Sequence, residues 1–154
     1  MLREKNLFDK IGSLIPGYVG YIERERRRQC DKILRDHIAA ELLKCENIIQ
    51  SRIAIEIEEK NYEIVEQFES ARKKIDTLLS KIKYSPSGGS AFFSVNQIRK
   101  PELENIFQKD LLLGQTIKQL EDLIQKSNIQ QILSSIDNLY SLIYERNEFI
   151  KEYK

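Results

Sequence analysis

The stretch that decides the fold is residues 30–49, which read CDKILRDHIAAELLKCENII. Apolar side chains recur there at every third or fourth position: Leu34, Ile38, Leu42, Cys45 and Ile49. On an α-helix this spacing places them on one face, where they can pack against other helices. Neither proline nor glycine occurs between residues 21 and 82, so we expect one long helix through that whole span.

A second apolar stripe follows within the same span. Its positions keep steps of three and four: Val65, Phe68, Arg72, Ile75, Leu79 and Ile82. Between the two stripes Ile53, Ile55 and Ile57 alternate as strand residues do, but the helical pattern on both sides favours a helix. We expect a kink or a short break in the long helix near residues 58–61.

Two further helices are expected in the last third of the chain, over residues 101–127 and 129–153. Pro101 suits the first turn of a helix, and Asn128 is a suitable N-cap for the second. The stripe of the first helix is Leu103, Ile106, Asp110, Leu113, Ile117, Leu120 and Ile124. That of the second is Ile129, Ile132, Ile136, Leu139, Ile143, Arg146 and Ile150. The short gap predicts antiparallel neighbours, or one long helix with a kink.

The remaining segments are a short amphipathic helix over residues 1–15, ended by Pro16 and Gly17, and a loop over residues 83–100. The sequence therefore predicts a single all-α domain, residues 1–154. Its architecture is expected to be an elongated, coiled-coil-like helical bundle with one very long helix and two C-terminal helices that return along it.

The composition limits the classes of partner. Lys and Arg number 25 and Asp and Glu 24, so the formal net charge is +1 and no global field attracts nucleic acid or anionic lipid. No apolar run approaches the ~20 residues of a membrane span. Charged residues interrupt the start of the chain, which therefore does not have the apolar core of a signal peptide. Cys30 and Cys45 lie about 22 Å apart on one helix, too far for a disulfide. We expect a cytoplasmic protein with reduced thiols, and membrane association is an alternative.

The chain holds few residues suited to catalysis. It has one histidine, His37, and lacks a Gly-rich phosphate loop and the Cys and His spacings of zinc sites. We therefore expect no enzymatic activity, no cofactor and no metal site, and we interpret His37 as a boundary residue of the long helix.

A charge-rich run opens the long helix, and Arg24, Arg28 and Arg35 share one face of it. Such a face could track phosphate groups. Interleaved acids instead allow pairs three or four residues apart, such as Glu23 with Arg27 and Asp31 with Arg35. A solvated, self-paired face is the favoured interpretation, and anionic lipid and nucleic acid are the alternatives.

Asp110 occupies an apolar stripe, where a lone carboxylate is destabilising unless it is paired. Arg72 and Arg146 fall on stripe positions of their own helices. The structural interpretation is a buried Asp–Arg pair that fixes helix register, and the functional alternative is a binding pocket built on the same residues.

Aromatic pairs mark two other places. Tyr18 and Tyr21 stand three residues apart beside Pro16-Gly17, so we expect a corner that packs on the bundle end with its hydroxyl groups outward. Phe92 and Phe93 are expected to tuck under the helix ends, or else to form an exposed contact for a partner.

Two stretches resemble patterns of an uncharacterised family of small, all-helical bacterial proteins. IPGYVGYIERERRRQCDKILRDHIA resembles IPGYxGYxxRExRRxADKxLRxxLA, and YSPSGGSAFFSVNQIRKPELENIFQKDLLL resembles YGYSGFFDAVKVxxxxLxxLYEFDLALL. The chain departs from the family by Ser-Ala before the Phe pair, where Ser-Gly is expected. The resemblance transfers no activity. It implies that the tyrosine turn, the Phe loop and Asp110 belong to one recurring design.

The leading functional hypothesis is a non-enzymatic helical scaffold or adaptor with an unknown protein partner, or with a second copy of the chain. One alternative is a peripheral membrane protein that uses the amphipathic helix, whose apolar residues are Leu7, Phe8, Ile11, Leu14 and Ile15. The second alternative, nucleic-acid binding through the face from Arg24 to Arg35, is disfavoured by the balanced charge.

Overall fold

The computed structural model describes residues 2–84, 90–126 and 128–153, and the side chains from residue 6 onward within those ranges. In this part of the chain every regular element is a helix. The elements are α1 (Leu2–Leu14), the 3-10 turn η1 (Arg24–Arg26), α2 (Arg27–Glu58), α3 (Tyr62–Lys83), α4 (Ala91–Ser94), α5 (Lys100–Lys126) and α6 (Ile129–Glu152). Residues 85–89 of the expected loop and residue 127 lie outside the described residues.

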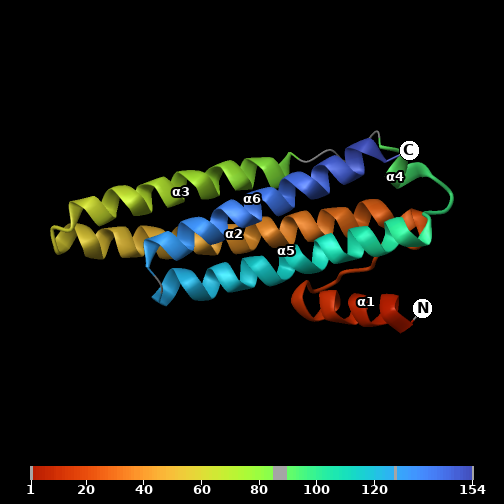
Figure 1. Cartoon of the computed structure of the whole chain (residues 1–154), viewed down its shortest axis with the longest axis horizontal. Coiled ribbons are helices and arrows are strands. Elements are labelled where there is room, and N and C mark those ends of the chain that lie inside the picture. Colours follow the sequence, from red (N-terminus) through yellow and green to blue (C-terminus); the bar gives the residue numbers. More distant parts are fainter. Residues whose placement is uncertain (1, 85–89, 127, 154) are drawn as a thin grey trace.

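Four long helices form an elongated bundle in which α2 packs against α3 and α5, and α6 packs against the same two helices (Figure 1). The chain alternates in direction, so that α5 runs parallel to α2, and α6 runs back. Helix α1 lies outside the bundle, along α5. The expected all-α, elongated bundle with a long helix and two C-terminal helices packed with it is confirmed.

The long helix expected over residues 21–82 is in fact an antiparallel pair, and this corrects the prediction. The chain turns back at residues 59–61, where only a kink or short break was expected. Lys60 adopts a left-handed backbone with φ of 62°. The amides of Glu59, Lys60 and Asn61 close the end of α2 by bonding to carbonyls of residues 55–57. Glycine usually takes such a left-handed position, so a lysine gave no signal of a reversal.

The apolar stripes meet in one core along the bundle. Those of α2, α5 and α6 are buried as the spacing predicts, except that Ile129, the first residue of α6, is only partly buried. In α3 the buried residues are Phe68, Ala71, Ile75, Leu78 and Ile82. Val65, Arg72 and Leu79, which were assigned to that stripe, are only partly buried. The helix is therefore rotated from the predicted orientation, because adjacent Leu78 and Leu79 allow two registers.

Residues 90–99, which lead into α5, run across one end of the bundle, and α3 and α5 lie at diagonal corners (Figure 1). We call residues 90–99 the crossing segment. It contains α4, a helical turn where only a loop was expected. Ser90 caps α4 by accepting a hydrogen bond from the Phe92 amide at 3.1 Å, and its own hydroxyl donates to the Ile150 carbonyl. We call this the closed end of the bundle.

Candidate functional site

The turn before α2 points its two tyrosines into the closed end. Gly17 and Gly20 have φ of 84° and 80°, a left-handed conformation that favours glycine. A Cβ on Gly20 would also lie 2.9 Å from the Phe8 ring, so α1 packs directly over this turn. Tyr18 and Tyr21 are both buried. The prediction that their hydroxyl groups point outward is therefore wrong. A buried hydroxyl group needs a hydrogen-bond partner, and both tyrosines find one inside the bundle.

That partner is Asp110 on α5. Its Oδ2 accepts hydrogen bonds from the hydroxyl groups of Tyr18 at 2.6 Å and Tyr21 at 2.5 Å. Its Oδ1 accepts one from Nε of Arg146, on α6, at 2.8 Å. Nη2 of Arg146 also donates to the Tyr21 hydroxyl at 2.8 Å. The predicted buried Asp–Arg pair is thus confirmed for Arg146, and the tyrosine turn completes it.

Asp31, on α2, extends the group to a third helix. Its Oδ1 lies 2.9 Å from Nη1 of Arg146, and the two form an ion pair without a hydrogen bond. Its Oδ2 accepts a hydrogen bond from Nε of Arg35 at 2.9 Å, so the expected pair of Asp31 with Arg35 is confirmed. We call Tyr18, Tyr21, Asp31, Asp110 and Arg146 the buried polar cluster.

Burial and charge both shift the titration of this cluster. Burial, reinforced by the Asp110 charge, raises the pKa of Tyr18 well above its usual value. Burial also raises the pKa of Tyr21, although Arg146 opposes it. For Arg146 burial would lower the pKa, but Tyr21, Asp110 and Asp31 outweigh it and the pKa is raised well above the usual value. Both tyrosines therefore stay neutral donors and Arg146 stays charged.

The arrangement of these groups indicates a structural role. Each charged group of the cluster faces an opposite charge inside it, and the contacts join the turn to α2, α5 and α6. Removing one member of a buried ion pair strands the other, at about 3–5 kcal/mol. The geometry supports the register-fixing interpretation of Asp110 over the binding pocket.

Arg72 does not join the cluster, so that part of the prediction is wrong. It pairs instead with Glu69 at 3.1 Å and Asp76 at 3.3 Å, both on its own helix. Two causes act together: α3 lies diagonally across the bundle from α5, and its rotation turns Arg72 toward the surface.

Arg27 is a buried residue that the sequence did not single out. Its Nε donates to the Tyr21 carbonyl at 2.9 Å, and Nη1 donates to the carbonyls of Phe92, at 3.3 Å, and Val95. Desolvation lowers its pKa. The expected pair with Glu23 is wrong, because Glu23 pairs with Arg26 at 3.0 Å. The local sequence does not distinguish Arg27 from the arginines on either side of it. Its burial depends on contacts with residues around α4, which are distant in the sequence.

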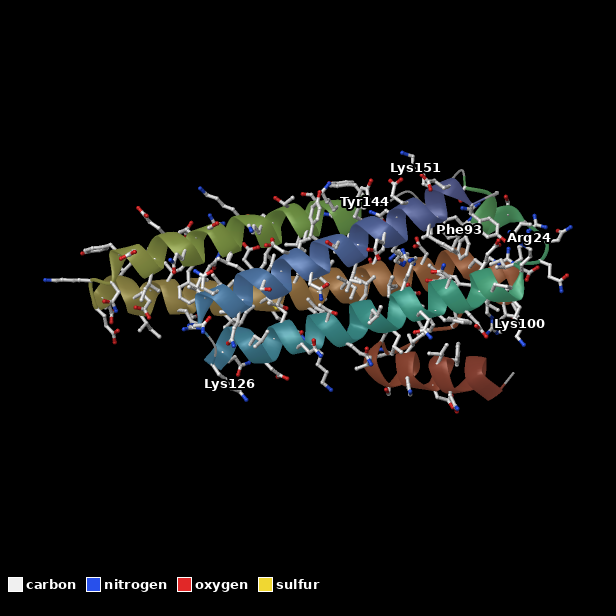
Figure 2. All side chains as sticks on the ribbon, in the orientation of Figure 1. Arg24, Phe93, Lys100, Lys126, Tyr144 and Lys151 are labelled. Atoms are coloured by element: carbon white, nitrogen blue, oxygen red, sulfur yellow. The ribbon has the colours of Figure 1, made fainter. Side chains whose placement is uncertain are left out.

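The three arginines predicted to share a face contact this chain's own residues. Nη1 of Arg24 donates to Oδ1 of Asn96 at 2.9 Å. The Arg28 guanidinium lies over the Phe93 ring, 5.2 Å from its centroid. Figure 2 shows Arg24 and Phe93 together at the closed end. Besides Asp31, Arg35 reaches the Lys83 carbonyl at 3.3 Å. The contacts of Arg24 and Arg28 tie η1 and the start of α2 to the crossing segment, and that of Arg35 ties α2 to the end of α3.

Phe92 and Phe93 are buried, which confirms that they tuck under the helix ends. The Phe92 ring packs edge-on against Tyr21, with centroids 5.3 Å apart, and against Phe93 at 5.2 Å. The two phenylalanines thus link the crossing segment to the ring cluster around the tyrosine turn. They are packing residues of the closed end rather than an exposed contact.

The opposite end of the molecule is different. There the α2–α3 hairpin extends past the ends of α5 and α6 (Figure 1). Lys126, the last residue of α5, lies well short of the hairpin's end in Figure 2. We call residues 53–66 the overhanging tip. Large apolar side chains are exposed on it: Ile55, Ile57, Tyr62 and Ile64. Sequence reasoning missed this surface because it depends on where α5 and α6 stop.

Within the described residues no group of three or more His, Cys, Asp or Glu side chains is placed to hold a metal ion. None of the helices in this part of the chain is long and apolar enough to cross a bilayer. Cys30 and Cys45 are both free and buried. Comparison of the chain with protein-family models, with curated proteins and with solved structures gives no match, so the function has to be argued from this geometry.

Proposed function

We propose that the protein is a non-enzymatic helical adaptor that binds another protein through the overhanging tip. The observation that carries the proposal is that the core stripe of the bundle continues on this tip as exposed apolar side chains. Exposed apolar side chains that gather in one place mark an interaction site more often than isolated ones do.

On α2 the change is abrupt. Every stripe residue from Leu34 to Ile53 is at most 8% exposed, and the next one, Ile57, is 49% exposed. On α3 the stripe residue Phe68 is 1% exposed, and Ile64, one turn before it, is 38% exposed. The apolar spacing continues through these positions on both helices. The exposure rises because α5 and α6 do not extend over them.

Two contacts show where the cover ends. Nη1 of Arg52 donates to the Ile124 carbonyl at 2.8 Å, and α5 ends two residues later at Lys126. Ile57 therefore lies about 4–5 Å beyond the end of α5 along the helix. Lys74 pairs with Asp137 at 2.9 Å. Counting back from that pair, α3 begins about 6 Å beyond the first residue of α6. The overhang is therefore about one helical turn.

The surfaces named by the two alternative functions are occupied by this chain's own contacts. Leu7, Ile11 and Ile15, from the apolar face of the first helix, are buried, and α1 packs on α5. Membrane insertion would require α1 to leave α5. Arg24, Arg28 and Arg35 bind the crossing segment and Asp31. Both surfaces are therefore less available to a partner than the exposed tip is.

Site-specific photocrosslinking in cells that naturally make the protein tests the proposal. A photoreactive p-benzoylphenylalanine at Ile57 samples the tip. The matched control places it at Leu43, which is 52% exposed on the middle of the same helix. We expect a discrete crosslinked species from position 57 that is absent from position 43 and that is lost when Ile64→Asp is added.

Two outcomes count against the proposal. The same products from both positions would show that the tip has no selectivity. No product from either position, in cells where the protein is present, would show that the tip has no partner. A product of twice the 18.1 kDa chain mass would identify the partner as a second copy.

A further inference from the structure

We propose that the partner presents a basic amphipathic helix, which lies on the overhanging tip in the place that α5 and α6 take along the rest of the bundle. This inference rests on the proposed adaptor function and adds the chemistry of the partner. It is carried by the charge of the tip, by the shape of its apolar stripe and by the poor fit of a second copy.

The tip is strongly acidic in a chain that is nearly neutral. Residues 53–66 contain five glutamates and one lysine, a formal net charge of −4, whereas the whole chain carries +1. Glu58, Glu59, Glu63 and Glu66 are exposed. They flank the exposed isoleucines at positions 55, 57 and 64, so a partner that covers these isoleucines comes within reach of the carboxylates. Lysine or arginine beside its own apolar stripe would match this surface.

The apolar stripe favours a helix as the occupant. Ile57 continues the stripe of α2 and Ile64 that of α3, and the two helices pack against each other side by side. Along the rest of the bundle these stripes accept other helices, α5 and α6. A further helix can use the same packing one turn beyond their ends, as amphipathic helices do in apolar grooves.

A second copy of the tip is a poor occupant. Two tips placed together would bring −4 against −4, and like charges at an interface disfavour association. Anionic lipid and nucleic acid are repelled for the same reason. The tip therefore repels anionic lipid and nucleic acid, although both of these attract a basic amphipathic helix.

The test uses the full chain and two synthetic probes of about 18 residues. Both probes carry leucines at positions i, i+3, i+4 and i+7. One has lysines at its other positions and the other has glutamates. Fluorescence anisotropy measures the Kd of each labelled probe in low-salt and in high-salt buffer. We expect the lysine probe to bind at least about tenfold tighter than the glutamate probe, and salt to weaken it.

Three variants locate the binding. Ile57→Ser with Ile64→Ser should weaken the lysine probe at least about tenfold, because it removes apolar cover. Glu58→Gln with Glu63→Gln should weaken it and reduce its salt dependence. Leu43→Ser is the matched control and should bind as the parent chain does. All five positions are exposed, and an unchanged thermal midpoint verifies that each variant is folded.

Each contrary outcome has its own meaning. Equal affinity for the two probes would overturn the basic partner and leave the adaptor function standing. Binding that the tip variants do not change would overturn the docking site. No binding of either probe would also overturn this inference, while the crosslinking experiment still decides the adaptor function. If the chain alone forms oligomers that Ile57→Ser with Ile64→Ser dissolves, the occupant is a second copy.

Discussion

At the scale of single residues, Asp110 accepts hydrogen bonds from three side chains while wholly buried. Asp110→Ala would leave Arg146 facing Asp31 alone, so we expect a loss of about 3–5 kcal/mol in the free energy of unfolding, measured by urea denaturation. A double-mutant cycle with Arg146→Met should show strong coupling, and one with Arg72→Met should be additive. Coupling to Arg72 would contradict the pairing described above.

The two tyrosines of the cluster are not equivalent. Tyr18 donates one hydrogen bond to Asp110, whereas Tyr21 donates to Asp110 and also accepts from Arg146. We expect Tyr18→Phe to lower stability by about 1–2 kcal/mol and Tyr21→Phe by more. Parallel urea titrations compare them. Equal losses would show that the Arg146–Tyr21 hydrogen bond adds nothing.

Two buried thiols make stability depend on alkaline pH. Burial raises the pKa of Cys30 and of Cys45 to about 12, from 9.0. A group whose pKa is higher in the folded state gives stability below its unfolded pKa and loses it as pH rises toward the folded value. Unfolding free energy should therefore fall between pH 9 and 12, by up to about 1.4 kcal/mol per pH unit for each thiol.

The raised pKa values of Tyr18 and Tyr21 steepen the same decline once pH passes their usual value of 10.0. Urea midpoints at several pH values between 8 and 11 measure the slope. Cys30→Ala and Cys45→Ala should each flatten it just above pH 9, where the tyrosines do not yet titrate. A slope that neither substitution changes would mean that the thiols are more accessible than the structure shows.

At the scale of elements, the crossing segment depends on one arginine. The Arg27 guanidinium binds the carbonyls of Phe92, Val95 and Asn96. Arg27→Lys keeps the charge but cannot span these acceptors with one ammonium group. We expect faster amide hydrogen exchange in residues 92–98 and a thermal midpoint lower by several degrees. Exchange in the overhanging tip should not change and serves as the internal control.

The sequence predicted which residues form helices more reliably than how those helices pack against one another. The stripes of α2, α5 and α6 were predictable because apolar positions three and four apart leave one solution. In α3 the adjacent Leu78 and Leu79 left two solutions, and packing selected the one that exposes Arg72. The reversal after Glu58 was predicted only as a break, because a left-handed lysine carries no signal.

The candidate site was only partly predictable for a similar reason. Asp110 and Arg146 could be identified because a charge within an apolar stripe needs a partner. The tyrosines bond to Asp110 across about 90 positions of sequence, and no local spacing reports such a contact. Only the family resemblance grouped the tyrosine turn with Asp110. Arg27 could not be distinguished from Arg26 and Arg28, because the crossing segment alone decides which of them is buried.

At the scale of the whole molecule, the two ends of the bundle differ in what they bury. The closed end holds the buried polar cluster and the aromatic rings, whereas the overhanging tip exposes its stripe. Asp31 and Ile57 are both on α2, and 26 residues of helix separate them by about 39 Å. Changes this far apart, with no shared partner, are expected to be additive in stability.

We therefore expect the two ends to respond separately. Tyr21→Phe should lower the urea midpoint and leave the affinity for the lysine probe within about twofold of the parent chain. Ile57→Ser should weaken the probe and leave the midpoint nearly unchanged, because its side chain is already half exposed. The double variant should show the sum of both effects. A Tyr21→Phe chain that folds but loses the probe would instead show that the order of the closed end is transmitted along α2 and α3 to the binding surface.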